Sequence, residues 1–477
     1  MLKKNPTILT LASVLSLAMS LSSLTAQDWT RFRGPNGSGI SEGSRLPEAF
    51  DAEGALLWSV EVPFGRSSPA VGGDRIFLTA IEEENLVTMA VGRRSGEVLW
   101  RSDVERDREA DLHSATDSST PSPVTDGENV FVFFQEFGLV SYDAAGGERW
   151  RLALGPFRNF YGIAASPILA GDLVIVVCDQ AGGSYLLAVD RDTGREVWRQ
   201  NRNARRESYT TPLLYPNAEA PEWVLVSGSK YLDAYHARTG ELAWTVPGLG
   251  AGPVASPVLA GDRIYVVAPD HNESPRDPYS TLLERHDANA DGTLAIEELE
   301  GVWMAAHFGW LDMDGDGSLS AADWEELDRE VTVDSWGLHA IALTEGAPPE
   351  IVWNYRPNAS YIPTPIVYRG LVYMIDDSIV TALDAGTGEL VKRGRAGKGK
   401  IYASPTAADG EILIATLAGE LLVLKAGSDW DIVRTHDLGD EIYAAPAIVD
   451  DTVFVRTRTR LMAYGGSADS AEESTTP

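Results

Sequence analysis

The sequence has one cysteine, Cys178, in 477 residues. A single cysteine excludes an internal disulfide. It ends the apolar run 173–178, which is typical of a buried strand, so we interpret it as a small hydrophobic residue rather than as a nucleophile. Histidine is also scarce, and the seven histidines show neither the spacing of a metal site nor a Ser/His/Asp order.

Basic residues are few as well. The chain has 39 Lys and Arg against 70 Asp and Glu, which gives a net charge of −31. Such a surface repels nucleic acid and anionic lipid, and this argues against both as partners. Beyond the N-terminus no apolar run reaches membrane-spanning length, so we expect no stable membrane insertion and a monomeric chain.

The N-terminus carries the one long hydrophobic run. Lys3 and Lys4 precede an apolar stretch over residues 8–24, and Ala26 follows two residues later. This pattern predicts a signal peptide over residues 1–26 and a periplasmic or secreted protein. An uncleaved anchor stays open, because Leu24 is large for its place before the cleavage site. At the other end, the polar residues 465–477 are predicted to form a disordered tail.

Two acidic loops follow each other in the middle of the chain. In residues 287–298, Asp287, Asn289 and Asp291 stand at positions 1, 3 and 5, with Gly292 at 6 and Glu298 at 12. Oxygen-bearing side chains at alternate positions converge as such a loop curls, glycine permits the bend, and the distant glutamate closes the cage. The loop resembles a calcium-binding EF-hand.

Residues 312–323 form the second copy, with aspartates at positions 1, 3, 5 and 12. Solvated acidic turns are the alternative, but two adjacent matches favour calcium sites. We expect Leu294 and Leu319, both at position 8, to pair across the loops, and one helix to join the loops. Because aspartate at position 12 is shorter than glutamate, the second loop should bind calcium more weakly. The predicted ligands are Asp287, Asn289, Asp291, Thr293, Glu298, Asp312, Asp314, Asp316, Ser318 and Asp323.

Most of the remaining chain repeats. A Ser, Thr or Ala followed by Pro recurs eight times, and short strands, an Asp-x-x-Thr-Gly turn and a tryptophan follow several of these steps, as in residues 188–198 and 234–244. Four short strands in each unit of about 40–50 residues indicate the blades of a β-propeller. The eight proline steps count eight blades. The repeat resembles the tryptophan-docking propellers of the quinoprotein family over residues 56–464.

The fold class is therefore predicted as all-β, an eight-bladed β-propeller with a small α-helical EF-hand insertion. The last unit lacks an outer strand, and we expect residues 56–60 to supply it, so that the ring closes without an open edge. Lys392 stands where blade 6 should have its tryptophan, which predicts weaker docking there. We place a leader at residues 27–55, propeller at 56–268 and 336–464, and the EF-hand pair at 269–335, inside blade 5.

The repeat pattern identifies some of the side chains that face the central channel. Arg66, Tyr209, Tyr402 and Tyr443 each stand three residues before a repeat proline, where the innermost strand is expected to begin. They predict either a funnel for an anionic planar ligand or the amphipathic lining of a hydrated channel. Further candidates on neighbouring loops are Arg158, Asn159, Tyr161, Arg205, Arg206 and Tyr361.

Quinoprotein dehydrogenases hold pyrroloquinoline quinone (PQQ) over this channel with arginine, acidic groups and calcium, beneath a ring formed by adjacent cysteines. This chain has no adjacent cysteines, which argues against PQQ without excluding it, so the expected cofactor is the calcium of the acidic loops. The resemblance then implies a non-catalytic scaffold for a protein partner or small ligand, similar to the lipoprotein of the outer-membrane β-barrel assembly machinery. A divergent PQQ-dependent oxidoreductase that uses the channel is the alternative. The leader is expected to pack across one face of the ring.

Overall fold

The structure is a computed structural model that describes residues 28–50, 54–106, 108, 112–113, 115–159, 161–203, 205–269, 277–331, 336–344, 346–357 and 359–465. The predicted signal peptide lies outside these residues, as does the predicted tail apart from its first residue. Among the described residues, no helix is long and apolar enough to cross a lipid bilayer.

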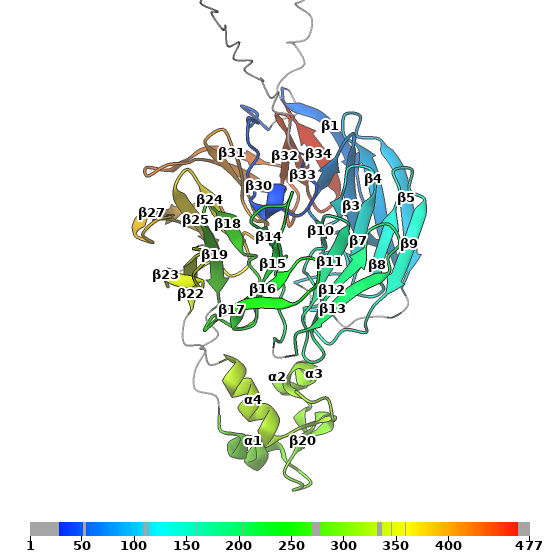
Figure 1. Ribbon diagram of the computed structural model, residues 1–477, viewed down its shortest axis with the longest axis vertical. Coiled ribbons are helices and arrows are strands. Elements are labelled where there is room, and N and C mark those ends of the chain that lie inside the picture. The colour runs from blue at the N-terminus through cyan, green and yellow to red at the C-terminus, as the bar shows by residue number, and fades with distance from the viewer. Residues whose placement is uncertain are drawn as a thin grey trace, which may run out of the picture.

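Eight four-stranded antiparallel sheets stand around a central axis, as the repeat predicts (Figure 1). Blades 1 to 4 consist of β2 (Ala70–Gly72), β3 (Arg75–Glu82), β4 (Asn85–Gly92), β5 (Val98–Glu105); β6 (Val124–Thr125), β7 (Val130–Phe134), β8 (Gly138–Tyr142), β9 (Glu148–Ala153); β10 (Ile168–Ala170), β11 (Leu173–Cys178), β12 (Tyr185–Asp190), β13 (Glu196–Asn201); and β14 (Leu213–Tyr215), β15 (Trp223–Gly228), β16 (Tyr231–His236), β17 (Leu242–Pro247). Blades 5 to 8 consist of β18 (Val258–Ala260), β19 (Arg263–Ala268), β22 (Gly337–Ala342), β23 (Glu350–Tyr355); β24 (Ile366–Tyr368), β25 (Leu371–Asp376), β26 (Ile379–Asp384), β27 (Leu390–Arg395); β28 (Thr406–Ala408), β29 (Glu411–Ala415), β30 (Glu420–Lys425), β31 (Asp431–Asp437); and β32 (Ala447–Val449), β33 (Thr452–Arg456), β34 (Arg460–Tyr464), β1 (Leu56–Glu61).

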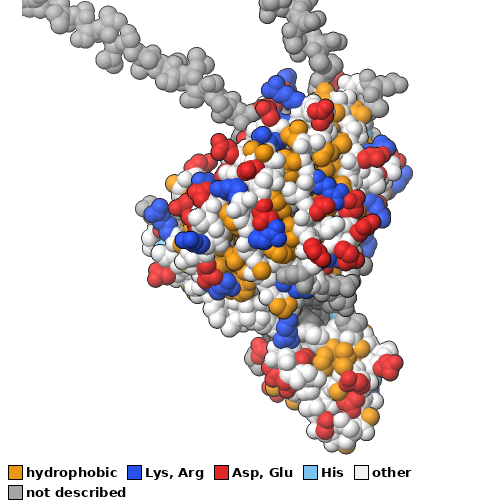
Figure 2. Space-filling model, turned by 90° about the vertical axis from the view of Figure 1, so that its right-hand side faces the viewer, with side chains coloured by type: hydrophobic (Ala, Val, Ile, Leu, Met, Phe, Trp, Pro, Cys, Tyr) orange, Lys and Arg blue, Asp and Glu red, His pale blue; other side chains and the backbone are white. Residues whose placement is uncertain are grey.

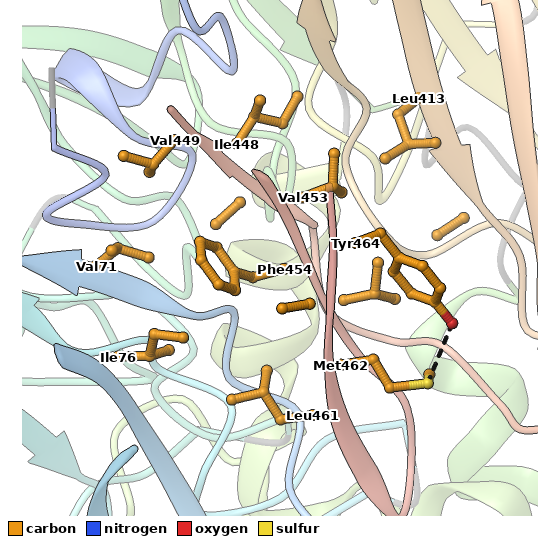
Figure 3. Close-up of a cluster of buried hydrophobic side chains, with 14 of the residues drawn as sticks. Val71, Ile76, Leu413, Ile448, Val449, Val453, Phe454, Leu461, Met462 and Tyr464 are labelled. Carbon is orange, nitrogen blue, oxygen red and sulfur yellow. Dashed lines mark hydrogen bonds between the residues drawn. The ribbon is translucent and has the colours of Figure 1, made fainter. Parts of the chain in front are cut away.

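The N-terminal strand closes the ring, which confirms that prediction. β1 pairs with β34, with Trp58 opposite Ala463 and Val60 opposite Leu461. Figure 3 shows the apolar side chains at this junction, where Phe454 and Tyr464 of the last blade lie among aliphatic residues. Because the first and last strands of the propeller share one sheet, separating them would expose both a sheet edge and this core.

Tryptophans lock neighbouring blades together. The Trp100 indole N–H donates to the Ala144 carbonyl of the next blade at 3.1 Å. The indole also lies against Gly146, whose φ is 85° and where a Cβ atom would come within 2.7 Å of the ring. Only glycine allows both that backbone conformation and that approach. The same docking joins Trp58 to Gly96, Trp150 to Gly194, Trp198 to Gly240 and Trp353 to Gly388.

Between blades 6 and 7 the docking runs in reverse. Lys392 occupies the tryptophan position of blade 6, and Trp430, in the last turn of blade 7, reaches back to it. The Trp430 indole N–H donates to the Lys392 carbonyl at 3.4 Å, and the Lys392 ammonium lies 5.0 Å from the indole centroid. Trp430 therefore compensates for the missing tryptophan, which the repeat pattern did not predict.

The leader crosses one face of the ring. Trp29 forms a β-bridge with Val71 of blade 1, and Ile40 forms one with Ala407 of blade 7, on either side of the short helix η1 (Pro35–Gly37). Arg33 is fully buried and donates to carbonyls of the sixth and seventh blades, including Thr364 at 3.1 Å. Burial lowers the pKa of Arg33 to about 9. The expected location of the leader is thus confirmed for residues 28–50.

The helical insertion lies between β19 and β22 and stands apart from the ring (Figures 1 and 2). Its elements are α1 (Tyr279–His286), β20 (Leu294–Ala295), η2 (Ile296–Leu299), α2 (Trp303–Ala306), α3 (Phe308–Leu311), β21 (Ser318–Leu319) and α4 (Ala321–Val331).

A single helix joining the two loops was a wrong prediction. Gly301, with φ 78°, separates η2 from α2, and His307, with φ −110° and ψ 9°, separates α2 from α3. The left-handed glycine prevents a helix from beginning before Trp303, and a further glycine at 309 weakens the second half.

Candidate functional site

The first acidic loop curls around its own backbone N–H groups. Asp287 Oδ2 accepts the N–H of Gly292 at 3.0 Å, and Glu298 accepts those of Ala288 and Ala295 at 2.9 Å each. Gly292 has φ 86°, which allows the sharp bend. Asp287 and Glu298, at the two ends of the loop, therefore both accept hydrogen bonds from N–H groups within it.

Carboxylates converge in the second loop. Oxygens of Asp312, Asp314 and Asp323 lie within 4.8 Å of one another. Asp323 accepts N–H bonds from Met313 and Ser320 at 2.8 Å each. Burial alone would raise the pKa of Asp323, but hydrogen bonds from Ser320 and the loop backbone outweigh burial and lower it. The carboxylate thus stays ionised, as a cation ligand must be.

The predicted pairing of the loops is confirmed. Leu294 pairs with Leu319 and Ala295 with Ser318 in a two-stranded ribbon. Both leucines are fully buried, in a small core that Leu282, Phe308 and Trp324 complete. The ribbon holds the two loops back to back in a fixed relative orientation.

Arg158 ties the insertion to the ring. It lies on the loop after β9, and its guanidinium donates to the carbonyls of Asp312 at 2.8 Å and Gly309 at 3.3 Å. Nearby, burial and the charge of His113 lower the pKa of His307, between α2 and α3. The insertion leaves blade 5 but contacts the loop between blades 2 and 3, so its second acidic loop lies beside the rim of the channel.

We expect Arg158→Ala to loosen this contact without unfolding the ring. A typical hydrogen bond contributes about 0.5–1.5 kcal/mol and one to a charged group about 1.5–3 kcal/mol. Because solvent reaches this contact we take the lower range, so hydrogen exchange of residues 299–323 should speed up roughly three- to tenfold. Arg195→Ala, at an exposed turn of blade 3, is the matched control and should leave that exchange unchanged. Unaltered exchange in Arg158→Ala would show that the contact does not hold the insertion.

The channel contains a cavity of about 330 Å³. Arg66, Tyr209, Tyr402 and Tyr443 all line it, together with Tyr161, Tyr361, His113 and, from the leader, Phe32. Their predicted place at the start of the innermost strands was wrong: each innermost strand begins after the proline, as β14 does at Leu213. These side chains lie instead on the loops that lead into the strands, because proline cannot supply the N–H that pairing within a sheet requires.

Arg66 is mostly buried in this cavity wall. Its Nε lies 3.3 Å from Asp117, and its guanidinium lies 4.7 Å from the centroid of the Tyr443 ring. Burial raises the pKa of Tyr209 well above its usual value and raises the pKa of Tyr361 to about 12. Both phenols therefore stay protonated at neutral pH.

A ring of hydroxyl groups lies below this rim, at the residues just before the repeat prolines. The N–H of each donates to the hydroxyl of its counterpart in the next blade at 2.9–3.0 Å. The ring is broken after Ser404, because Ala445 has no hydroxyl. The donor–acceptor pairs are Ser68–Ser122, Ser122–Ser166, Ser166–Thr211, Thr211–Ser256, Ser256–Thr364, Thr364–Ser404 and Ala445–Ser68.

The other predicted channel residues have different roles. Arg158 holds the insertion, Asn159 donates to the Asp179 carbonyl at 3.0 Å, Arg205 forms a bidentate pair with Asp233, and Arg206 lies 3.8 Å from Glu207. Sequence reasoning missed the hydroxyl ring, although its signal, a hydroxyl residue before nearly every repeat proline, was visible.

Comparisons with known proteins agree with this architecture. Residues 83–215 and 182–277 match the family of outer membrane protein assembly factor BamB. BamB from Moraxella catarrhalis has a similar structure, with 14% identity and a TM-score of 0.56 over 86% of this chain and 99% of that one. No curated protein matches the chain by sequence.

Two dehydrogenase structures share the fold to the same degree. A europium-containing methanol dehydrogenase has 11% identity and a TM-score of 0.58 over 92% of this chain and 90% of its own. The quinohemoprotein alcohol dehydrogenase from Comamonas testosteroni has 13% identity and a TM-score of 0.58 over 94% and 82%. These likenesses support a PQQ-like propeller, whose structural neighbours include both an assembly factor and enzymes.

Proposed function

We propose that this protein is an exported, calcium-binding propeller that works by binding a partner rather than by catalysis. The observation that carries the proposal is the pair of acidic loops, which are fixed back to back through Leu294 and Leu319. Carboxylate oxygens of Asp312, Asp314 and Asp323 converge in one loop. Hard oxygen ligands in flexible loops of this length suit calcium, and an exported protein meets calcium in abundance.

The channel gives little support to the alternative, a PQQ-dependent oxidoreductase. PQQ is a tricarboxylate, and in the dehydrogenases of this family it lies beside calcium. Among the described residues that line the cavity, none is a carboxylate or an amide that could hold that ion, and the basic residues are Arg66 and His113. Since Arg66 already lies against Asp117, the residues do not fit the quinone with its calcium, and we derive no reaction from it.

A scaffold role is consistent with the outside of the ring. Exposed aliphatic side chains recur on the outer strands, among them Leu57, Leu99 and Leu242, which are 47–49% exposed. Figure 2 shows apolar side chains interspersed with acidic and basic ones on one side of the ring. A mixed surface of this kind is compatible with protein contacts. The likeness to an outer membrane assembly factor points the same way, toward a protein partner outside the cytoplasm.

Calorimetric titration of the full chain with calcium tests the metal assignment. We expect two sites with dissociation constants on the order of 10⁻⁵ to 10⁻³ M, the first loop binding more tightly, and weaker heats with magnesium. Absence of any calcium heat would refute the assignment.

Separate experiments test the scaffold role. Co-purification from the periplasm with and without chelator should recover a partner. In a dye-linked alcohol oxidation assay with added PQQ and calcium we expect no turnover. Turnover that Arg66→Ala or Tyr209→Phe abolishes would instead establish the enzyme.

A further inference from the structure

The hydroxyl ring in the channel has more donors than the protein satisfies. Each of the seven hydroxyl oxygens accepts a backbone N–H, and this leaves the hydroxyl proton to donate. Among the residues that the structure describes, none accepts a hydrogen bond from these hydroxyls. Each of the seven side chains is at most 7% exposed. Buried donors are costly to leave without acceptors, so the ring needs an acceptor inside the cavity.

The lining of the cavity favours an anionic acceptor. The basic side chains of the lining are Arg66 and His113, and no acidic side chain is among the described lining residues, although Asp117 lies 3.3 Å from Arg66 Nε. The net charge of −31 repels anions at long range. That repulsion is screened over about 8 Å in physiological salt, whereas the ring and Arg66 act at contact distance.

The upper wall of the cavity is aromatic. Tyr161 and Tyr209 meet edge to face with ring centroids 5.6 Å apart, and Tyr402 and Tyr443 lie 6.5 Å apart on the wall's other loops. Flat apolar groups pack well against such faces and edges. The cavity, at about 330 Å³, lies near the small end of ligand pockets, which span roughly 300–1,000 Å³.

We propose that the channel binds a small planar monocarboxylate, with its carboxylate among the ring hydroxyls near Arg66 and its flat body among the rim tyrosines. Two carboxylate oxygens can accept bonds from several hydroxyls at once. A polyanion fits less well, because Arg66 also faces Asp117 and further buried charges would lack a counter-ion. The site is separate from the calcium loops, so it does not depend on the proposed calcium binding.

The experiment is a calorimetric titration with benzoate, and with benzamide as an uncharged molecule of the same shape. We expect the full-length protein to bind benzoate at least tenfold more tightly than benzamide. Arg66→Met should remove most of that preference while leaving benzamide binding similar. If neither molecule binds at millimolar concentration, or both bind equally, the ring holds only water and the proposal is overturned.

Two variants test the ring itself. Ser256→Ala removes one donor to the carboxylate and should weaken benzoate roughly tenfold or more, the effect of one hydrogen bond to a charged group. The native Ala445 occupies an equivalent position, which shows that a blade tolerates alanine there. Ala445→Ser completes the ring and should tighten benzoate by a similar factor. Because Ser256 Oγ accepts the Thr211 N–H at 2.9 Å, Ser256→Ala should also lower the melting temperature, so benzoate affinity is measured well below that temperature. Benzoate affinity that responds to neither change would overturn the ring as its binding site. If Ser256→Ala fails to fold, an unchanged affinity in Ala445→Ser alone overturns it.

Discussion

Replacing Arg202 by alanine is expected to lower the free energy of unfolding by about 3–5 kcal/mol, because it leaves the buried Asp179 carboxylate without its counter-ion and leaves Asp233 with Arg205 alone. The Arg202 side chain is fully buried and forms two bonds to Asp179, at 2.8 and 2.9 Å, and one to Asp233 at 3.1 Å. Asp179 follows β11 in blade 3, and Asp233 lies in β16 of blade 4. This network of ion pairs therefore joins blades 3 and 4.

Neighbouring groups satisfy the rest of this network. Ser208 donates to Asp179 at 2.7 Å, and Arg205 and Thr245 donate to Asp233 at 2.7–2.8 Å. Burial alone would lower the pKa of Arg202, but the charge and hydrogen bonds of Asp179 outweigh burial and raise it. Arg202 is thus charged whenever the protein is folded.

Urea denaturation of the wild type and the variant measures the effect. The matched control is Arg45→Ala, which removes an exposed ion pair with Asp451 at 3.3 Å, and it should change stability by less than about 1 kcal/mol. A loss as small in Arg202→Ala as in the control would show that water or the remaining groups compensate the two carboxylates.

Replacing Glu298 by glutamine is expected to weaken calcium binding to the first loop on the order of a hundredfold, since ligand charge tunes the affinity of such loops over several decades. Glu298 closes the loop: its two oxygens accept the N–H groups of Ala288 and Ala295, near opposite ends of the acidic segment. Glutamine keeps one oxygen and loses the charge, so it cannot close the cage bidentately.

Calorimetry should show the tighter calcium transition lost in Glu298→Gln and retained in Glu297→Gln, the adjacent exposed glutamate. The second loop offers the converse change. Asp323→Glu supplies the missing methylene and should tighten calcium at that site relative to magnesium. A wild-type isotherm from Glu298→Gln would remove the first loop from the list of calcium sites.

The eight blades were predictable because their signals are local and repeated. A hydroxyl residue before proline, a Thr-Gly turn and a tryptophan recur at near-constant spacing, and each acts within its own blade or the next. Closure by β1 was predictable for a related reason, since one strand was missing from the last unit and one was left over at the start. The acidic loops could be read directly, because the spacing of their oxygen-bearing residues is set by one short turn of chain.

Places where the structure departs from the repeat could not be predicted from local motifs. Trp430 docks against Lys392 from the opposite direction, and two glycines and His307 break the predicted shared helix. In both places the outcome depends on backbone conformations and side-chain directions that no spacing rule specifies. The four predicted channel residues do meet in one cavity, although they come from loops rather than from strands.

The sequence by itself determined the ring, its closure and the presence of two acidic loops, since all three follow from motifs a few residues long. Only the tertiary structure decided which groups meet across the channel. It joined a loop between blades 2 and 3 to an insertion from blade 5 through Arg158, joined blades 3 and 4 through Arg202, and set seven hydroxyls in one ring. Such contacts depend on how far each blade is rotated about the common axis, and that rotation is fixed only when the whole ring closes.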